Sequence, residues 1–288
     1  MNEDGPIRIE DDGAVRHLVL CRAEAYNTIN VEIRDALSAA IDAADDDDTV
    51  KVLLLRAEGK AFCAGFGLDW STMEQARAAA DGGWDSMHDL RRIGSYAAAF
   101  SKLHSCSKPT IASVQGWCVA GGTDLALNCD IIICGDSAKF GYPPARIWGV
   151  PEQPWLWVAR IGLQAARRYL FTGDEIDAAE AERLGLVWQR VPDEALLETA
   201  STLAHRMAML PLNQLQMHKL VLNDVAHRSF DPATSRMLGC LFDGVARHTR
   251  EGIDFVDRAN IVGWRAAIDE RDRPFADYSH RAQQPHKN

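Results

Sequence analysis

Two apolar runs, each followed by a glycine-rich turn, stand out in the pattern of hydrophobic and polar positions. The first run covers residues 50–56 and leads into the turn at 61–69; the second covers 109–115 and leads into the turn at 116–124. Short runs that are apolar throughout are typical of strands buried on both faces. Each turn opens onto a segment with helical character, so the pattern predicts two strand–turn–helix units.

The shorter patterns around these units predict further elements. Alternation on either side of Asp11-Asp12-Gly13 predicts a hairpin of strands 6–10 and 14–22. Apolar residues at helical spacing predict a helix over 31–44, with Asn30 as its N-cap. We also expect a helix-rich segment over 69–107 with a loop near 81–83, a helix over 121–128, and strands at 131–134 and 139–141.

The chain changes character in its C-terminal part. From about residue 163 the pattern is mainly helical, with one short strand predicted at 187–191. Helices are expected over 195–209, 212–228, 233–250 and 252–268. Repeated strand–turn–helix units followed by a helical tail predict an α/β core over residues 1–195 and a helical region over 196–288.

Composition and charge narrow the functional classes. The 288 residues are 47% apolar and 25% charged, with a formal net charge of −10, which argues against a nucleic-acid-binding surface. The acidic run 45–48 is interpreted as a solvated loop, not as a metal site. No run of about 18 apolar residues predicts a membrane span. The acidic N-terminus does not resemble a targeting peptide.

The seven cysteines lie mostly in apolar segments and include no C-x-x-C pair, so we expect reduced core residues in a cytoplasmic protein. Cys63 lies inside the first turn, but no histidine partner is placed near it by the sequence, and we interpret it as a small packing residue. No phosphate-binding loop, dinucleotide motif or His/Cys ligand spacing is found, so no metal or redox cofactor is predicted.

The two glycine turns carry the clearest chemical signal. A strand that ends in glycine and leads into a helix leaves backbone N–H groups free to bind an anion. Two such turns side by side would stabilise one developing negative charge on an oxygen, as in acyl chemistry. Each such donor is worth roughly two to three orders of magnitude in rate where it has been tested.

At these residues the chain resembles the crotonase (enoyl-CoA hydratase/isomerase) superfamily. The resemblance covers most of the chain up to about residue 191 and rests on four segments in the family's order and spacing. They are Leu20–Asn30, Phe62–Phe66, Gly116–Asp130, and Leu170–Asp174 together with Ala178–Gly185.

The resemblance implies a crotonase-like spiral of ββα units with a helical C-terminal region that packs homotrimers, often paired into hexamers. It implies an acyl-CoA substrate, with coenzyme A present only as part of the thioester. By position match, the backbone N–H groups of Phe66 and Gly121 would bind the thioester oxygen, and the ring of Phe66 can pack in the core at the same time. The coenzyme A path would follow Arg22, Ala25, Ala64 and Leu68.

The chain departs from the hydratase pattern at both acid–base positions. The position of the first catalytic glutamate holds Asp124, whose side chain reaches roughly 1.5 Å less far. We favour a catalytic or pocket role for Asp124; the alternative is a residue that only stabilises a helix start. The second glutamate is missing: Pro143 is followed by Pro144 and Ala145, which cannot transfer protons.

The second acid–base group must therefore come from elsewhere. The candidates are Glu152, Tyr142, Arg146, Asp69 and His88, and for each of them a structural role is the competing interpretation. Asp69 is more readily explained as a helix cap. Residues 150–157, the altered loop, replace the glycine-rich loop of the hydratases. Trp148, Trp155 and Trp157 cluster near it, either as core residues or as the wall of a wide pocket for a bulky acyl group.

Three functions stay open at this point. The first is hydration or isomerisation of an enoyl-CoA through an enolate-like intermediate, in an enzyme that is not a standard two-glutamate hydratase. The second is hydrolysis of a thioester or of a carbon–carbon bond, with Asp124 or Glu152 activating water. The third is an acyl-CoA-binding subunit without catalytic activity. Turnover would exclude the third, and the identity of the product would separate the first two.

Overall fold

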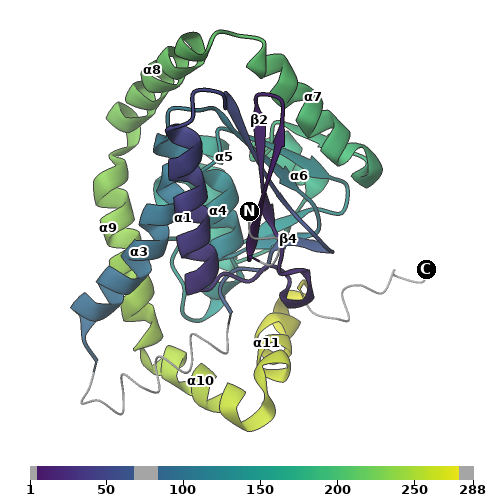
Figure 1. Cartoon of the computed structure of the whole chain (residues 1–288). Coiled ribbons are helices and arrows are strands. Elements are labelled where there is room, and N and C mark those ends of the chain that lie inside the picture. The colour runs from purple at the N-terminus through teal and green to yellow at the C-terminus, as the bar shows by residue number, and fades with distance from the viewer. Residues whose placement is uncertain (1–4, 68–83, 279–288) are drawn as a thin grey trace.

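The apolar runs form the centre of a six-stranded sheet in the computed structural model, which describes residues 5–67 and 84–278 (Figure 1). The strand order is β1 (Ile7–Asp12), β2 (Val15–Leu20), β3 (Val52–Ala57), β5 (Thr110–Val114), β7 (Ile131–Gly135) and β10 (Gln189–Val191). The hairpin β1–β2 is antiparallel, and every later pairing in this sheet is parallel.

A second, four-stranded sheet collects the short strands that follow. Its order is β4 (Ala61–Cys63), β6 (Trp117–Val119), β8 (Lys139–Gly141) and β9 (Ile176–Asp177). Strands β3, β5 and β7 lie in the first sheet, and β4, β6 and β8 come directly after them along the chain. The chain therefore passes repeatedly from one sheet to the other, which confirms the expected ββα arrangement and brings the turns after β4 and β6 to the same side.

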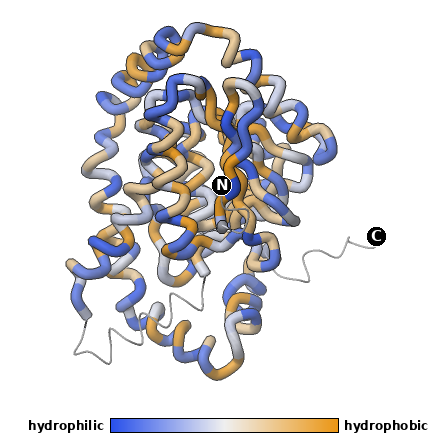
Figure 2. Tube along the Cα trace, in the orientation of Figure 1, coloured by the Kyte–Doolittle hydropathy of each residue, from blue (hydrophilic) through white to orange (hydrophobic). Residues whose placement is uncertain are grey.

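The first sheet is buried on both faces, as the continuous apolar runs predict. Leu53 and Leu55 of β3 belong to the main core, which also contains Ile33 and Leu37. The alternate residues of the same strand, Val52 and Leu54, pack on the opposite face against α7 (Leu196–Ala208). Apolar residues accordingly concentrate on the central strands, whereas the outer helices mix apolar and polar positions (Figure 2).

The first helix of the core begins where the sequence signal places it. In α1 (Val31–Asp45) the Asn30 side chain accepts a hydrogen bond from the Ile33 N–H at 2.9 Å, so Asn30 is the N-cap. The other helices of this part are α3 (Ser86–Ser105), α4 (Gly121–Leu127), α5 (Pro154–Thr172) and α6 (Ala178–Leu184). Short 3-10 turns occupy Ala23–Ala25, Pro143–Arg146, Asp193–Ala195 and Arg273–Phe275.

The C-terminal helices form an arc around the core (Figure 1). After α7 they are α8 (Leu212–Phe230), α9 (Pro232–Arg247), α10 (Arg250–Val262) and α11 (Trp264–Asp272). Helix α9 packs against α3 and α5. A Cβ at Gly239 of α9 would lie 2.5 Å and 2.6 Å from the carbonyl oxygens of Pro151 and Glu152, so α9 holds the segment that carries Glu152 closely.

Three boundaries differ from the sequence predictions. The helix expected over 252–268 is two helices, because Gly263 adopts φ +84° and ends α10. The helical part begins at Pro154 and not near 163, with proline in the first turn, where its missing N–H costs nothing. The strand expected at 187–191 begins only at Gln189. The loop expected near 81–83 lies outside the described residues.

In the part of the chain that the structure describes, no helix is both long enough and apolar enough to cross a membrane.

Candidate functional site

The two glycine turns that the sequence singles out pack directly against each other. A Cβ added to Gly65 would lie 2.9 Å from the Cβ of Ala120, and one added to Gly122 would lie 2.2 Å from the carbonyl oxygen of Cys63. Gly65 has φ +88°, and Ala120 has φ +53°, a conformation that non-glycine residues rarely adopt. The glycines are therefore required both by backbone conformation and by the close approach of the turns.

The backbone N–H groups of Phe66 and Gly121 are left out of the internal hydrogen bonds. On either side of Phe66, the Ile29 N–H donates to the Gly65 carbonyl and the Gly67 N–H donates to the Ile29 carbonyl. The Phe66 N–H lies between these two hydrogen bonds and points away from Ile29. Gly121 is the first residue of α4, where a helix provides no acceptor. Over 5–67 and 84–278 neither N–H donates to a protein acceptor, so both are available to a ligand.

The ring of Phe66 has a second task. A Cβ at Gly121 would lie 2.6 Å from Cε2 of Phe66, so the ring covers the start of α4. The same ring meets Tyr96 edge-on, with 5.2 Å between the ring centroids. Phe66 therefore packs its ring against the core and also borders the site. A ring that packs in the core is compatible with a backbone N–H that faces the site, as expected from the sequence.

Asp124 lies in the first turn of α4 and is completely buried. Neither of its carboxyl oxygens has a hydrogen-bond partner of standard length among the described residues. Desolvation by burial raises the pKa of Asp124 to about 8; the backbone N–H groups of Glu152 and Gln153 oppose the rise, and the charge of Asp243 adds to it. A carboxyl group held in this state is suited to proton transfer near neutral pH.

Glu152 supplies a second carboxyl group next to the first. It is 1% exposed, and its Oε2 has no hydrogen-bond partner among the described residues. Burial raises the pKa of Glu152 well above its usual range, and the charges of Asp124 and Asp243 raise it further. Arg247 and Arg92 oppose the shift. Two carboxyl groups whose titrations interact in this way are typical of acid–base sites.

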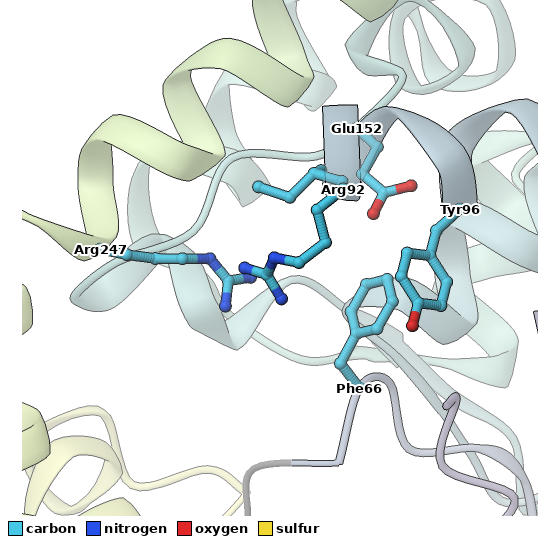
Figure 3. Close-up of a pocket in the computed structure, with 6 residues that line it drawn as sticks. Phe66, Arg92, Tyr96, Glu152 and Arg247 are labelled. Carbon is cyan, nitrogen blue, oxygen red and sulfur yellow. The ribbon is translucent and has the colours of Figure 1, made fainter. Parts of the chain in front are cut away.

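A pocket lies beside Glu152; Asp124, which is completely buried, is not among its walls. The pocket is partly open to solvent, and its walls are Phe66, Arg92, Ile93, Tyr96, Glu152 and Arg247. In Figure 3 the rings of Phe66 and Tyr96 form one side, Glu152 comes from above, and Arg92 and Arg247 reach the pocket from different directions. The pocket therefore joins the first glycine turn to the segment that carries Glu152.

The arginines come from two different helices. Arg247, near the end of α9, contacts Asp243 one turn earlier through Nη2 at 2.8 Å and Nε at 3.1 Å. Arg92, on α3, lies 3.5 Å from Asp89. Both side chains are nearly buried, with 11% and 12% exposed.

Tyr142 does not line the pocket. Its hydroxyl group donates a hydrogen bond to the carbonyl oxygen of Val150 at 2.8 Å. Burial raises the pKa of Tyr142 well above its usual range, so its hydroxyl stays protonated. The Val150 N–H in turn lies 3.3 Å from Oδ1 of Asp243. These contacts fix the segment just before Glu152, and they give Tyr142 a positioning role.

Arg146 is an anchor for the C-terminal segment and not a pocket residue. Its guanidinium, 2% exposed, pairs with Asp272 at 2.9 Å, with Asp277 at 2.7 Å and with Asp174 at 3.3 Å. It also stacks on Phe275 at 3.8 Å from the ring centroid. All of these partners are structural.

His88, a further acid–base candidate, is not brought to the pocket. His88 is exposed on α3, and Asp69 lies outside the described residues. Burial raises the pKa of Cys63 to about 12, so its thiol is unreactive, as expected for a packing residue.

The three tryptophans near the altered loop are core residues. Trp157 is fully buried, and Trp155 packs against Phe230. Trp148 belongs to a separate cluster with Phe255 and Trp264. None of the three lines the pocket, so a wide tryptophan-walled pocket is not formed; the aromatic wall consists of Phe66 and Tyr96.

The residues expected along the coenzyme A path are partly brought together. Nη1 of Arg22 donates to the carbonyl oxygen of Thr28, and the Ala64 N–H donates to Tyr26 at 3.0 Å. The 3-10 turn that holds Ala25 therefore lies beside the first glycine turn. Leu68 lies outside the described residues.

Sequence reasoning missed the side chains that complete the pocket, above all Arg92, Tyr96 and Arg247. Asp243 and Arg247 are four residues apart, which predicts only an ordinary pair on a helix surface. Arg92 follows another arginine and has no distinguishing signal. In the described ranges, no group of three or more potential ligands is placed to hold a metal ion.

The chain is similar to proteins of one known family over most of its length. The family model described as enoyl-CoA hydratase/isomerase matches residues 10–255. A Mycobacterium bovis protein named "Probable enoyl-CoA hydratase" is 30% identical over 271 residues, covering 92% of this chain and 95% of the relative. The mitochondrial Delta(3,5)-Delta(2,4)-dienoyl-CoA isomerase of Dictyostelium discoideum is 31% identical over 240 residues, covering 80% and 81%.

A solved structure is similar over nearly the whole chain. The crystal structure of an enoyl-CoA hydratase from Mycobacterium smegmatis superposes with a TM-score of 0.90 at 39% sequence identity, and 97% of each chain is covered. The similarity includes the C-terminal helices as well as the two sheets.

Proposed function

Since the chain belongs to the enoyl-CoA hydratase/isomerase family, we propose that it moves the double bond of an enoyl-CoA thioester by proton transfer between Asp124 and Glu152. The observation that carries this proposal is the pair of buried carboxyl groups at the two glycine turns: Asp124 ends the second turn, and Glu152 lines the pocket that Phe66 of the first turn borders. Both have raised pKa values, and each is buried almost completely. The position of the family's second glutamate is occupied by Pro144-Ala145, so Glu152 takes over that role from a different segment.

We assign the base role to Asp124 and the acid role to Glu152. Burial raises the pKa of Asp124 to about 8. Burial and the charge of Asp124 raise the pKa of Glu152 well above its usual range, which favours its protonated form. In a 3-enoyl-CoA, ionised Asp124 removes a proton from the carbon next to the thioester. Glu152 then gives its proton to the far end of the resulting dienolate, which yields the 2-enoyl-CoA. Proton return from Asp124 to Glu152 restores the starting state.

The backbone groups of the two turns stabilise the intermediate. While the dienolate exists, negative charge resides on the thioester oxygen, and the N–H groups of Phe66 and Gly121 are the donors assigned to it. Fixed backbone donors need no reorganisation when the charge develops, which makes them effective catalytic groups. Their orientation follows from Gly65 and from the unusual backbone of Ala120.

Two features favour isomerisation over hydration. Hydration requires two groups that hold one water molecule, and here the usual second position has no side chain that bonds to water. The Glu152 carboxyl group is also almost fully withdrawn from solvent, next to apolar walls formed by Phe66, Ile93 and Tyr96, and Asp124 is completely buried. A relative that is named as an isomerase is 31% identical to the chain over 240 residues.

The test is the identity of the product. Incubation of the purified protein with 3-hexenoyl-CoA in D₂O, followed by NMR, is expected to give 2-hexenoyl-CoA carrying deuterium. Crotonyl-CoA in the same assay is expected to give little 3-hydroxybutyryl-CoA. Efficient hydration of crotonyl-CoA without isomerisation would overturn the assignment, and release of free coenzyme A would favour the hydrolase alternative.

The same proposal includes the coenzyme A path and the assembly. Arg22, Ala25, Ala64 and Leu68 are assigned to the coenzyme A moiety through the position match. The C-terminal helices are assigned to a homotrimer or a dimer of trimers, because α8 exposes Leu220, Val221, Leu222 and Val225. Sedimentation is expected to show a species about three or six times the chain mass, and a stable monomer at micromolar concentration would contradict it.

A further inference from the structure

One face of α9 meets the segment that carries Glu152. Residues 150–153, between the 3-10 turn at 143–146 and α5, form neither helix nor strand, so neighbouring elements must hold this segment in place. Three residues of α9 contact residues 150–155, and they are spaced by four positions: Ser235, Gly239 and Asp243. Residues four apart in a helix lie on the same face.

The two outer residues of this face bind backbone N–H groups on either side of Glu152. Before it, Oδ1 of Asp243 accepts a hydrogen bond from the Val150 N–H at 3.3 Å. After it, Oγ of Ser235 accepts one from the Trp155 N–H at 3.1 Å. Both hydrogen bonds therefore tie the segment to α9.

Between these two hydrogen bonds the segment lies directly on the helix. A Cβ at Gly239 would lie 2.5 Å from the carbonyl oxygen of Pro151 and 2.6 Å from that of Glu152. Distances this short exclude a side chain, so the backbone reaches α9 only because position 239 is glycine. The backbone of Glu152 is thus held before, at and after the residue.

Asp243 is the charged member of this face, and it is only 4% exposed. Its Oδ2 accepts hydrogen bonds from Arg247 one turn later, at 2.8 Å and 3.1 Å, which fixes the orientation of the carboxylate. Oδ1 is then directed at Val150, which is 93 positions away in the sequence. An ion pair that only decorates a helix surface needs neither this burial nor a contact with a distant segment.

Val150 is held from its other side as well. Its carbonyl oxygen accepts the hydrogen bond of the Tyr142 hydroxyl at 2.8 Å, while its N–H donates to Asp243. Val150 precedes Glu152 by two residues, which span at most about 7 Å of chain. A displacement at Val150 is therefore transmitted to Glu152 over a short distance.

We propose that Asp243 is a positioning residue, which holds the Glu152 carboxyl group in place for proton transfer through the backbone of Val150. This inference rests on the acid role that the proposed function assigns to Glu152. Oε2 of Glu152 has no hydrogen-bond partner among the described residues, so no bond at that atom orients the side chain in place of the backbone. Misplacing a reacting group by about 1 Å can cost about 100-fold in rate.

Two neutral variants separate the hydrogen bond from the charge. Asp243→Ala and Asp243→Asn both remove the negative charge, but only asparagine can still accept the Val150 N–H. The full-length variants are incubated with 3-hexenoyl-CoA in D₂O at a pH just above the pKa of about 8 of Asp124, so that the base is mainly ionised. NMR follows deuterium exchange next to the thioester, which needs Asp124, and formation of 2-hexenoyl-CoA, which also needs Glu152.

The two reactions are expected to respond differently. In Asp243→Ala, isomerisation is expected to fall about 10- to 100-fold, while exchange stays within about threefold of the wild-type rate. Asp243→Asn is expected to lie between Asp243→Ala and the wild type. If Asp243→Ala fails to fold, Asp243→Leu keeps the volume of the side chain without an acceptor, and the same separation of the two reactions is expected.

A double variant shows whether Asp243 acts through Glu152. In the Glu152→Gln background the acid is already absent, so Asp243→Ala is expected to lower isomerisation by less than about twofold further. An equal further fall in both backgrounds would overturn the inference, because the two residues would then act independently.

The matched control is Asp254 on α10. It also lies four positions from an arginine, Arg250, but the two side chains are 70% and 91% exposed. Asp254→Ala removes the same charge from the protein and is expected to leave both reactions unchanged.

The failure of this inference differs from the failure of the proposed function. Equal loss of exchange and isomerisation in Asp243→Ala, or wild-type rates of both, would overturn the positioning role and leave the acid role of Glu152 intact. Isomerisation at the wild-type rate in Glu152→Gln would reject the acid role itself, and the positioning role with it.

Discussion

The site has a backbone half and a side-chain half, and the two are built differently. The backbone half consists of the turns at Gly65 and Gly121, and each turn is fixed by its own local sequence. The side-chain half collects Asp124 from α4, Glu152 from the segment before α5, Arg92 from α3 and Arg247 from α9. Local sequence therefore determines where an oxyanion is held, whereas tertiary packing determines which chemistry follows.

The largest effect is expected from breaking the backbone half. Gly122→Ala would place a Cβ 2.2 Å from the carbonyl oxygen of Cys63, and neither backbone can move without separating the turns. We expect destabilisation of roughly 3 kcal/mol or more and loss of activity. Thermal unfolding and the isomerase assay measure both.

Gly94→Ala is the matched control for that change. Gly94 lies within α3, and a Cβ there would meet nothing within 4 Å. This variant is expected to be as stable as the wild type, or more stable by up to about 1 kcal/mol, because alanine favours the helix. If Gly122→Ala behaved like Gly94→Ala, the close contact of the turns would not be essential.

The next effect concerns the side-chain half alone. Asp124→Asn keeps the shape of the residue but removes the base, and it leaves the backbone donors in place. We expect a fall in kcat of about two to four orders of magnitude, with folding and acyl-CoA affinity retained. Steady-state kinetics with calorimetry separate these effects, and undiminished kcat would reduce Asp124 to a residue that favours the helix start.

The pH dependence of the rate sharpens the assignment of the base. Asp124 acts when it is ionised, and its pKa is about 8 because of burial. The rate is therefore expected to rise about tenfold for each pH unit below that value and to level off above it. A rate that is constant from pH 6 to pH 8 would show that a group with an ordinary carboxyl pKa is the base.

The smallest effect is expected at Tyr142. Tyr142→Phe removes the hydrogen bond to Val150 and is expected to cost about 1 kcal/mol of stability. Because Tyr142 positions the segment before Glu152 without lining the pocket, kcat is expected to fall less than tenfold. A loss of a hundredfold or more, with stability unchanged, would restore Tyr142 as a proton-transfer group.

The difference between the two halves also explains which parts of the fold and of the site can be predicted from the sequence alone. The turns, the strands before them and the Asn30 cap follow from local patterns and are found where these patterns place them. The sequence alone offers Glu152 only as one candidate among several, because its position near Asp124 depends on tertiary packing. Gly239 has no side chain, which lets the backbone of α9 approach the carbonyl groups of Pro151 and Glu152. Arg92 and Arg247 are 155 positions apart, and no local pattern links them. The helix expected over 252–268 divides at Gly263, whose φ of +84° cannot be read from the helical pattern around it.

The most direct test of the acid–base pair compares two reactions in Glu152→Gln. Glutamine resembles the protonated glutamate in shape but cannot give up a proton. We predict that isomerisation of 3-hexenoyl-CoA falls by about two to four orders of magnitude, while Asp124 still exchanges the proton next to the thioester with D₂O. NMR follows both reactions in one sample. Isomerisation at the wild-type rate in this variant would contradict the central claim that Glu152 is the second carboxyl group of the site.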